Sequence, residues 1–298
     1  MTEHTKGVLI TMVGVLAIAP DSLLIRLIDA PHMTVVFWRA AFAAVAILTA
    51  VTLFYRARTP AILRGLGVKG LGYAVFTSLG TTLFVLAVQL TAVANAVFII
   101  SLAPVFAAIV SRIFLGERIS RRVAVTIGLT IVGAAVIAHG SLSVGGEALV
   151  GDILALGAAA MLASAFTVAR AARSISMVPA AGVAYVITSL TSLPFLTLGS
   201  MQGPDWLFAA LLGLVFIPIG ASLMALGPRY ISSAEVSLLL LLEAVIAPLL
   251  VWGIIGETPH PATLAGGAIL LVVLAGSNAL ALRRRRAPPA SVPTSVTG

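Results

Sequence analysis

Ionisable residues are rare in the long apolar segments of this chain, so the few that occur there are the first candidates for chemistry. Glu243 lies near the middle of such a segment, where a carboxylate meets no water unless a cavity supplies it. In a cavity it would take up a proton or bind the amine of a substrate. A neutral carboxyl group that only hydrogen-bonds to a neighbouring helix is the alternative, and the sequence leaves both open.

Two opposite charges stand close to the ends of the first two apolar segments. Asp21 and Arg39 would meet if these segments were adjacent antiparallel helices. Such a pair is expected to be structural or part of a gate rather than a substrate site. Prolines inside apolar segments are further gate or hinge candidates, because each removes one helical hydrogen bond, although proline also serves simply to shape membrane helices. They are Pro20, Pro104, Pro194, Pro218 and Pro248.

Hydroxyl groups and aromatic rings are mixed along several apolar segments. Such a mixture would suit a chamber for small amphipathic solutes, although any one of these side chains could instead pack helices together. Asn95, close to a segment end, is expected to form helix-terminal hydrogen bonds. Besides Glu243, the predicted lining residues are Tyr73, Phe76, Ser78, Thr82, Phe98, Ser101, Ser164, Tyr185 and Ser222.

The residues needed for most catalytic sites are missing from the sequence. The chain has no cysteine, its four histidines fall at segment ends or in loops, and neither an HExxH motif nor a GxxxxGK[ST] phosphate loop occurs. We therefore expect no enzyme, no metal, no cofactor and no ATP hydrolysis.

Composition identifies the solvent of this protein as a lipid bilayer. Hydrophobic residues make up 60% of the 298 residues, charged residues only 9%, and the mean hydropathy is +1.15. A membrane-crossing helix needs about 20 apolar residues. The sequence predicts an all-α integral membrane protein with ten such helices, at residues 7–28, 34–54, 66–88, 92–114, 123–139, 150–171, 179–199, 206–226, 232–255 and 262–282. The longest outer loop is expected near residues 140–149.

Basic residues set the orientation of these ten segments. With the amino terminus inside, 16 of the 18 Lys and Arg lie on the cytoplasmic side, and the other two are Arg26 and Arg39. Because basic residues near helix ends stay in the cytosol, this bias predicts cytoplasmic termini in the cell inner membrane. The net charge of +8 is thereby a topological signal rather than a sign of nucleic-acid binding. Residues 283–298 are expected to form a basic, disordered cytoplasmic tail.

The second half of the chain resembles the first. A shift of 140 residues aligns Gly80, Leu83, Ala94, Gly116 and Glu117 with Gly220, Leu223, Ala234, Gly256 and Glu257. Because each half holds five spans, the second would be inverted in the membrane. We expect repeats at residues 7–139 and 150–282 that enclose a central cavity, an arrangement typical of transporters.

Two short motifs carry a resemblance to a known family. The run from Leu102 to Ala108 with the Gly116-Glu117 pair is similar to the first-repeat signature of the EamA family of the drug/metabolite transporter superfamily. A second copy runs from Leu241 to Pro248 with Gly256-Glu257. One departure is that Ala244 follows the glutamate, where family members often have proline.

The resemblance implies ten helices around a central cavity, with helices five and ten outside. It also implies export of amino acids or other small metabolites, most similar to the YddG-type amino-acid exporters. We therefore predict a secondary exporter that works by alternating access on a small-molecule substrate, as a monomer or a weak homodimer. The alternatives are a passive facilitator of another metabolite class and, less favoured, an intramembrane lipid-processing enzyme.

Overall fold

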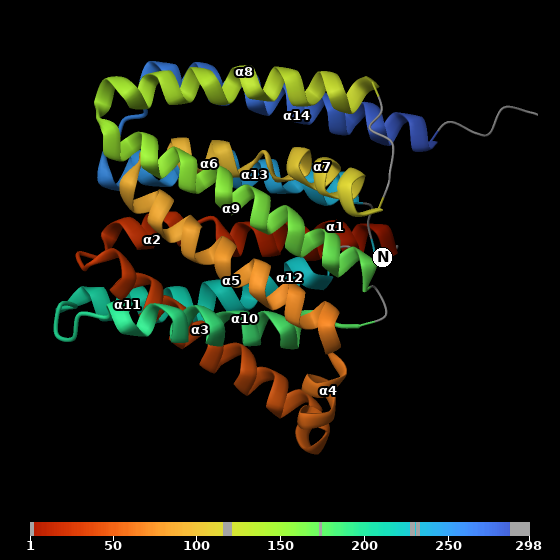
Figure 1. Cartoon of the computed structure of the whole chain (residues 1–298), viewed down its shortest axis with the longest axis vertical. Coiled ribbons are helices and arrows are strands. Elements are labelled where there is room, and N and C mark those ends of the chain that lie inside the picture. The colour runs from red at the N-terminus through yellow and green to blue at the C-terminus, as the bar shows by residue number, and fades with distance from the viewer. Residues whose placement is uncertain (1–2, 116–120, 173–174, 227–229, 231–232, 287–298) are drawn as a thin grey trace, which may run out of the picture.

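The described part of the chain is built from helices that lie roughly along one direction. The computed structural model describes residues 3–115, 121–172, 175–226, 230 and 233–286, and these contain helices and turns but no strand (Figure 1). Helices suit a bilayer because they satisfy their own backbone hydrogen bonds. Nine described helical stretches are long and apolar enough to cross a membrane, and Leu239–Ile255 is a shorter apolar one. The chain is therefore a multi-pass membrane protein. The predicted tail beyond residue 286 lies outside the described residues.

The first half of the chain begins at one end of the bundle and passes back and forth along it. We call the end at which Glu3 lies the amino-terminal face, and the end at which Leu27 lies the distal face. The helices are α1 (Glu3–Ile18), α2 (Asp21–Leu27), α3 (His32–Tyr55), α4 (Thr59–Gly65), α5 (Gly67–Leu90), α6 (Val93–Ile100), α7 (Ala103–Leu115) and α8 (Arg121–Val144), with a 3-10 turn at Arg56–Arg58.

The second half begins at the distal face and continues the same traverse. Its helices are α9 (Gly146–Ala171), α10 (Val178–Ser192), α11 (Pro204–Ala210), α12 (Ile217–Leu226), α13 (Ser233–Ile255) and α14 (Pro261–Arg286). A 3-10 turn, η2 (Leu193–Phe195), ends α10, and a π-helix, η3 (Leu211–Phe216), joins α11 to α12.

Prolines begin new helical segments more often than they bend continuous ones. Pro20 separates α1 from α2, Pro104 is the second residue of α7, and Pro218 follows η3 as the second residue of α12. Proline is well tolerated in the first turn of a helix, where its missing N–H would have no partner anyway. Pro194 falls in η2, and Pro248 lies inside an uninterrupted α13. The predicted first and fourth spans are therefore divided, whereas the eighth is one continuous helical stretch with a π-helix before Pro218.

The prediction of a long outer loop near residues 140–149 is wrong. Helix α8 continues to Val144 and α9 begins at Gly146, so that Gly145, with φ of +150°, alone joins them. Close packing explains why Gly140 stays helical, since a Cβ added there would lie 2.8 Å from the Cβ of Ala262 in α14. A longer connection at the distal face runs between Phe195 and Pro204, because α10 ends sooner than predicted. Helix α4 was not predicted.

Helix packing places α8 and α14 together at one edge of the bundle (Figure 1). Gly133 and Gly266 allow their backbones to approach, because a Cβ added to Gly266 would lie 2.6 Å from the carbonyl oxygen of Gly133. In the rest of the bundle α5 packs on α9, α1 on α12, α3 on α10, and α6 on α13. These contacts surround the interior that holds Asp21 and Arg39.

Candidate functional site

The centre of the candidate site is a buried ion pair, which we call the central ion pair. Asp21 is the first residue of α2, directly after the break at Pro20, and Arg39 lies on α3, as expected for adjacent helices. The guanidinium Nε donates to Asp21 Oδ1 at 3.0 Å, and Nη2 donates to Oδ2. The two residues are 4% and 3% exposed, so the pair is held in a dry environment where ion pairing is strong.

Side chains from three other helices surround the central ion pair. The ring of Phe84 on α5 lies 5.8 Å from Arg39 Cζ. Tyr185 on α10 is buried, lies beside Thr81, and interacts electrostatically with both members of the pair. Glu243 on α13 is partly buried and interacts electrostatically with Asp21. The structure thus brings Glu243, Tyr185, Asp21 and Arg39 into one neighbourhood.

Of the other predicted lining residues, those on α5 and α10 lie next to this neighbourhood. Thr188 Oγ1 donates to Ser78 Oγ at 2.9 Å and so joins the two helices. Thr82 Oγ1 donates to the carbonyl oxygen of Ser78 at 3.0 Å. The Ser78 hydroxyl group therefore takes part in a contact between α5 and α10, whereas the Thr82 hydroxyl group bonds within α5. Their role in lining a chamber stays a prediction.

The remaining predicted residues are more scattered. Phe98 is buried and packs against Gly267 of α14. Ser101 donates to the carbonyl oxygen of Phe98 where α6 ends, and Ser164 donates to Ala160 within α9. Tyr73 packs with Leu66 and Met177, both near helix ends at the amino-terminal face. Phe76 on α5 and Ser222 on α12 are partly buried.

A polar connection at the distal face was missed by the sequence analysis. We call it the distal latch, and it consists of Arg26, Gln89, Thr91, Val93 and Glu257. Arg26 Nε donates to Glu257 Oε2 at 3.0 Å, while its two terminal nitrogens donate to the carbonyl oxygens of Gln89 and Thr91, each at 3.2 Å. Glu257 Oε1 accepts from the backbone N–H of Val93, the first residue of α6, at 2.8 Å.

The distal latch joins three parts of the chain that are far apart in sequence. It ties the end of α2 to the α5–α6 turn and to the segment after α13. Two features of the sequence point to these residues. Arg26 is one of the two basic residues that do not lie on the predicted cytoplasmic side, and Glu257 belongs to the Gly-Glu pair that occurs in both halves of the chain. Neither feature predicts that Arg26 and Glu257 form an ion pair.

A second polar cluster lies directly behind the latch. Asp152 accepts from Thr91 Oγ1 at 2.8 Å and from Ser141 Oγ at 2.5 Å, and Asn95 donates to the same serine at 2.7 Å. Thr263 donates to Asn95 Oδ1 at 2.6 Å, which adds α14 to the cluster. Since every member is buried and hydrogen-bonded, this cluster fixes α6, α8, α9 and α14 together at the distal face.

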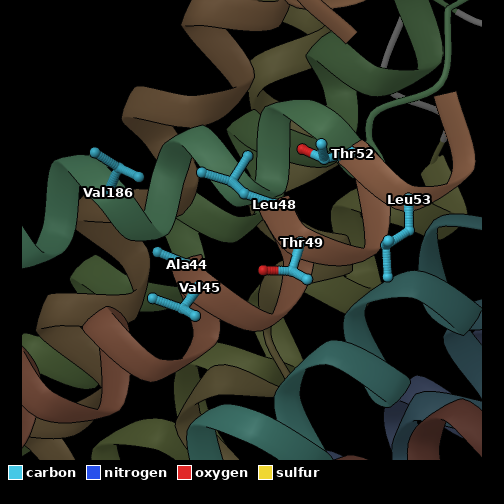
Figure 2. A pocket seen from close by; sticks show the side chains of 7 residues that line it. All are labelled: Ala44, Val45, Leu48, Thr49, Thr52, Leu53 and Val186. Carbon is cyan, nitrogen blue, oxygen red and sulfur yellow. The ribbon is translucent and has the colours of Figure 1, made fainter. Parts of the chain in front are cut away.

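One pocket of about 440 Å³ lies between α3 and α10, away from the central ion pair (Figure 2). It belongs to the half of α3 that leads to the amino-terminal face. None of the predicted lining residues contributes to it. Its walls are Ala44, Val45, Leu48, Thr49, Thr52, Leu53 and Val186.

Apolar spans that enclose a few charged side chains are typical of membrane transport proteins. No group of three or more metal-ligating side chains occurs in the described part of the chain. A model of the EamA-like transporter family matches residues 5–139 and again residues 149–279. The chain therefore belongs to the EamA-like transporter family, within the drug/metabolite transporter superfamily.

Two individual proteins are similar to this chain. A protein of Archaeoglobus fulgidus described as an uncharacterized transporter is 27% identical over 255 residues, which are 84% of this chain and 88% of that protein. A solved crystal structure, described only as that of a protein, superimposes with a TM-score of 0.62 at 18% identity and covers 95% of this chain and 98% of its own. This second likeness concerns the fold alone.

Proposed function

We propose that this protein is a secondary transporter that exports small amphipathic metabolites, with amino acids as the substrate class, by alternating access. In this proposal ten helices form two inverted halves around a chamber at the central ion pair. The protein lies in the inner membrane with both termini and the amino-terminal face in the cytoplasm.

The pattern of helix contacts is the observation that carries this proposal. If the halves are inverted copies, each contact must have a counterpart in the other half or join equivalent helices. The contact of α5 with α9 has its counterpart in that of α12 with α1. Three further pairs join equivalent spans of the two halves: α3–α10 joins the second spans, α6–α13 the fourth spans and α8–α14 the fifth spans. An inverted repeat predicts this set of contacts, and the site of such transporters lies between the halves.

The polar contacts at the distal face suit one state of an alternating cycle. At the distal face the latch and the buried cluster of Asp152 hold four or more helices together. The pocket between α3 and α10 (Figure 2) does not reach the central ion pair, and its wall includes the exposed apolar side chains of Val45 and Leu53. We interpret this conformation as closed at the distal face.

The charges around the chamber suggest how transport is driven. Asp21 and Arg39 neutralise one another, so Glu243 is left as a carboxyl group without a counter-charge among the residues that the structure describes. A proton or the ammonium group of a substrate would supply that charge. We therefore propose Glu243 as the coupling residue. A passive facilitator stays the alternative, because proton relays usually use more than one such group.

Efflux from proteoliposomes tests the proposed function. Vesicles that contain the purified protein and an internal mixture of amino acids should lose at least one of them faster than protein-free vesicles do. The same measurement on vesicles loaded with nucleosides or sugars separates amino acids from other metabolites. No accelerated efflux of any solute, together with product formation from a lipid, would favour an enzyme instead.

A further inference from the structure

Arg39 has more hydrogen-bonding capacity than its surroundings use. A guanidinium carries five N–H groups on three nitrogens. Two nitrogens, Nε and Nη2, donate to Asp21, whereas Nη1 has no hydrogen-bond partner in the described part of the chain and is closed to solvent. A buried polar group without a partner destabilises a fold, because it has lost its hydrogen bonds to water and gained none in return. A fold that needed only to neutralise Asp21 would have no reason to leave this donor open.

The same guanidinium is held firmly in place. Asp21 on α2 accepts two hydrogen bonds from the guanidinium, and the ring of Phe84 lies beside the guanidinium. The π-helix η3 fixes the backbone of Arg39, because a Cβ added to Gly213 would come within 2.8 Å of the Arg39 carbonyl oxygen. Insertions of this kind in helices are frequent at functional sites. A rigid donor pays little entropy when it binds a ligand.

We propose that Arg39 Nη1 binds the carboxylate of the transported substrate, with Asp21 as the residue that positions the guanidinium. This inference rests on the proposed transport function and assigns a residue to one end of the substrate. Guanidinium groups recognise planar oxyanions through paired N–H donors. Glu243 interacts electrostatically with Asp21, so its carboxyl group lies in the same neighbourhood and would face the ammonium group of a zwitterion whose carboxylate binds Arg39. Because Arg39 is 3% exposed here, the carboxylate reaches it in a more open state of the transport cycle.

Binding measurements with matched pairs of probes test the assignment. The purified full chain is titrated with common L-amino acids and with the carboxamide of each, which keeps the ammonium group and the side chain but removes the carboxylate. The tightest-binding acid should bind at least 10-fold more tightly than its amide. In the double variant Asp21→Asn/Arg39→Gln, which removes both charges and leaves neither unpaired, the ratio should fall below 3-fold.

Controls separate this inference from a general loss of structure. Arg64→Gln, at an exposed position on α4, should keep the wild-type ratio. Arg39→Lys keeps the charge but loses the fork of donors, and its ratio should fall between those of the wild type and the double variant. An unchanged ratio in the double variant, or no acid that binds more tightly than its amide, overturns the assignment. Either result leaves the transport proposal standing whenever the same preparation accelerates solute efflux from proteoliposomes.

Discussion

At the scale of single residues, the central ion pair stabilises the fold only while both charges are present. Asp21→Asn leaves Arg39 as a lone buried cation, and we expect a loss of about 3–5 kcal/mol of stability. The double variant Asp21→Asn/Arg39→Gln should recover most of that loss, because it removes the second charge as well. Thermal unfolding in detergent micelles measures both. A double variant as unstable as the single one would show that the two residues do not act as a pair.

Glu243 makes a separate prediction about coupling. If this carboxyl group carries the transported proton, Glu243→Gln should transport at a rate that no longer depends on pH, since an amide does not titrate. The substitution is nearly isosteric, so the variant should keep the thermal midpoint of the wild type. Efflux from proteoliposomes across a range of pH checks the prediction. A pH profile that matches the wild type would exclude Glu243 as the proton carrier and favour the facilitator.

Some of the site could be predicted from these residues and some could not. Asp21 and Arg39 are rare charges on consecutive spans, so their pairing follows from the bilayer and from short connections. The Arg26–Glu257 pair joins positions 231 residues apart, and its existence depends on the tertiary arrangement. Phe98 and Tyr73 look like chamber residues in the sequence, yet each packs in a helix contact whose partners no local pattern reveals.

At the scale of helices, the contact between η3 and α3 depends on the lack of a side chain at Gly213. A Cβ there would contact the Cβ of Phe42 and lie 2.9 Å from the backbone nitrogen of Ala43. Gly213→Ala should therefore cost about 1–3 kcal/mol through overpacking and displace Arg39. Gly253→Ala on α13 is the matched control, because no heavy atom of another element lies within 4 Å of its added Cβ. Thermal unfolding of the two variants tests this prediction, and the midpoint should be lower for Gly213→Ala than for Gly253→Ala. Equal midpoints would contradict the proposed role of Gly213 in the contact.

Helix existence and helix boundaries differ in how far the sequence predicts them. Runs of about 20 apolar residues identify the spans, because bilayer thickness demands that length. The division of the fourth span at residues 101–102 and the π-helix at Leu211–Phe216 were not predicted. Both depend on contacts with other helices, as does the helical conformation of Gly140, which glycine propensity alone argues against. Local patterns therefore locate the apolar spans better than they predict where each helix begins, ends or changes its form.

At the scale of the whole molecule, transport by alternating access requires the two halves to move against one another around the central ion pair. In the conformation described here the distal latch joins α2 of the first half to the segment after α13 of the second half. Export by alternating access requires this face to open once in each cycle. A chemical link across the latch should therefore stop transport, whereas the same reagent attached to one side of it should not.

Because the sequence contains no cysteine, the variant Arg26→Cys/Glu257→Cys offers two unique thiols for a short, reducible bifunctional cross-linker. Each single-cysteine variant, treated with the same reagent, controls for its attachment and for loss of the latch. The most direct test is the rate of solute efflux from proteoliposomes before linkage, after linkage and after reduction. If the distal face must open in each cycle, efflux should fall to the protein-free rate on linkage and return on reduction. Undiminished efflux from fully linked protein would contradict this prediction.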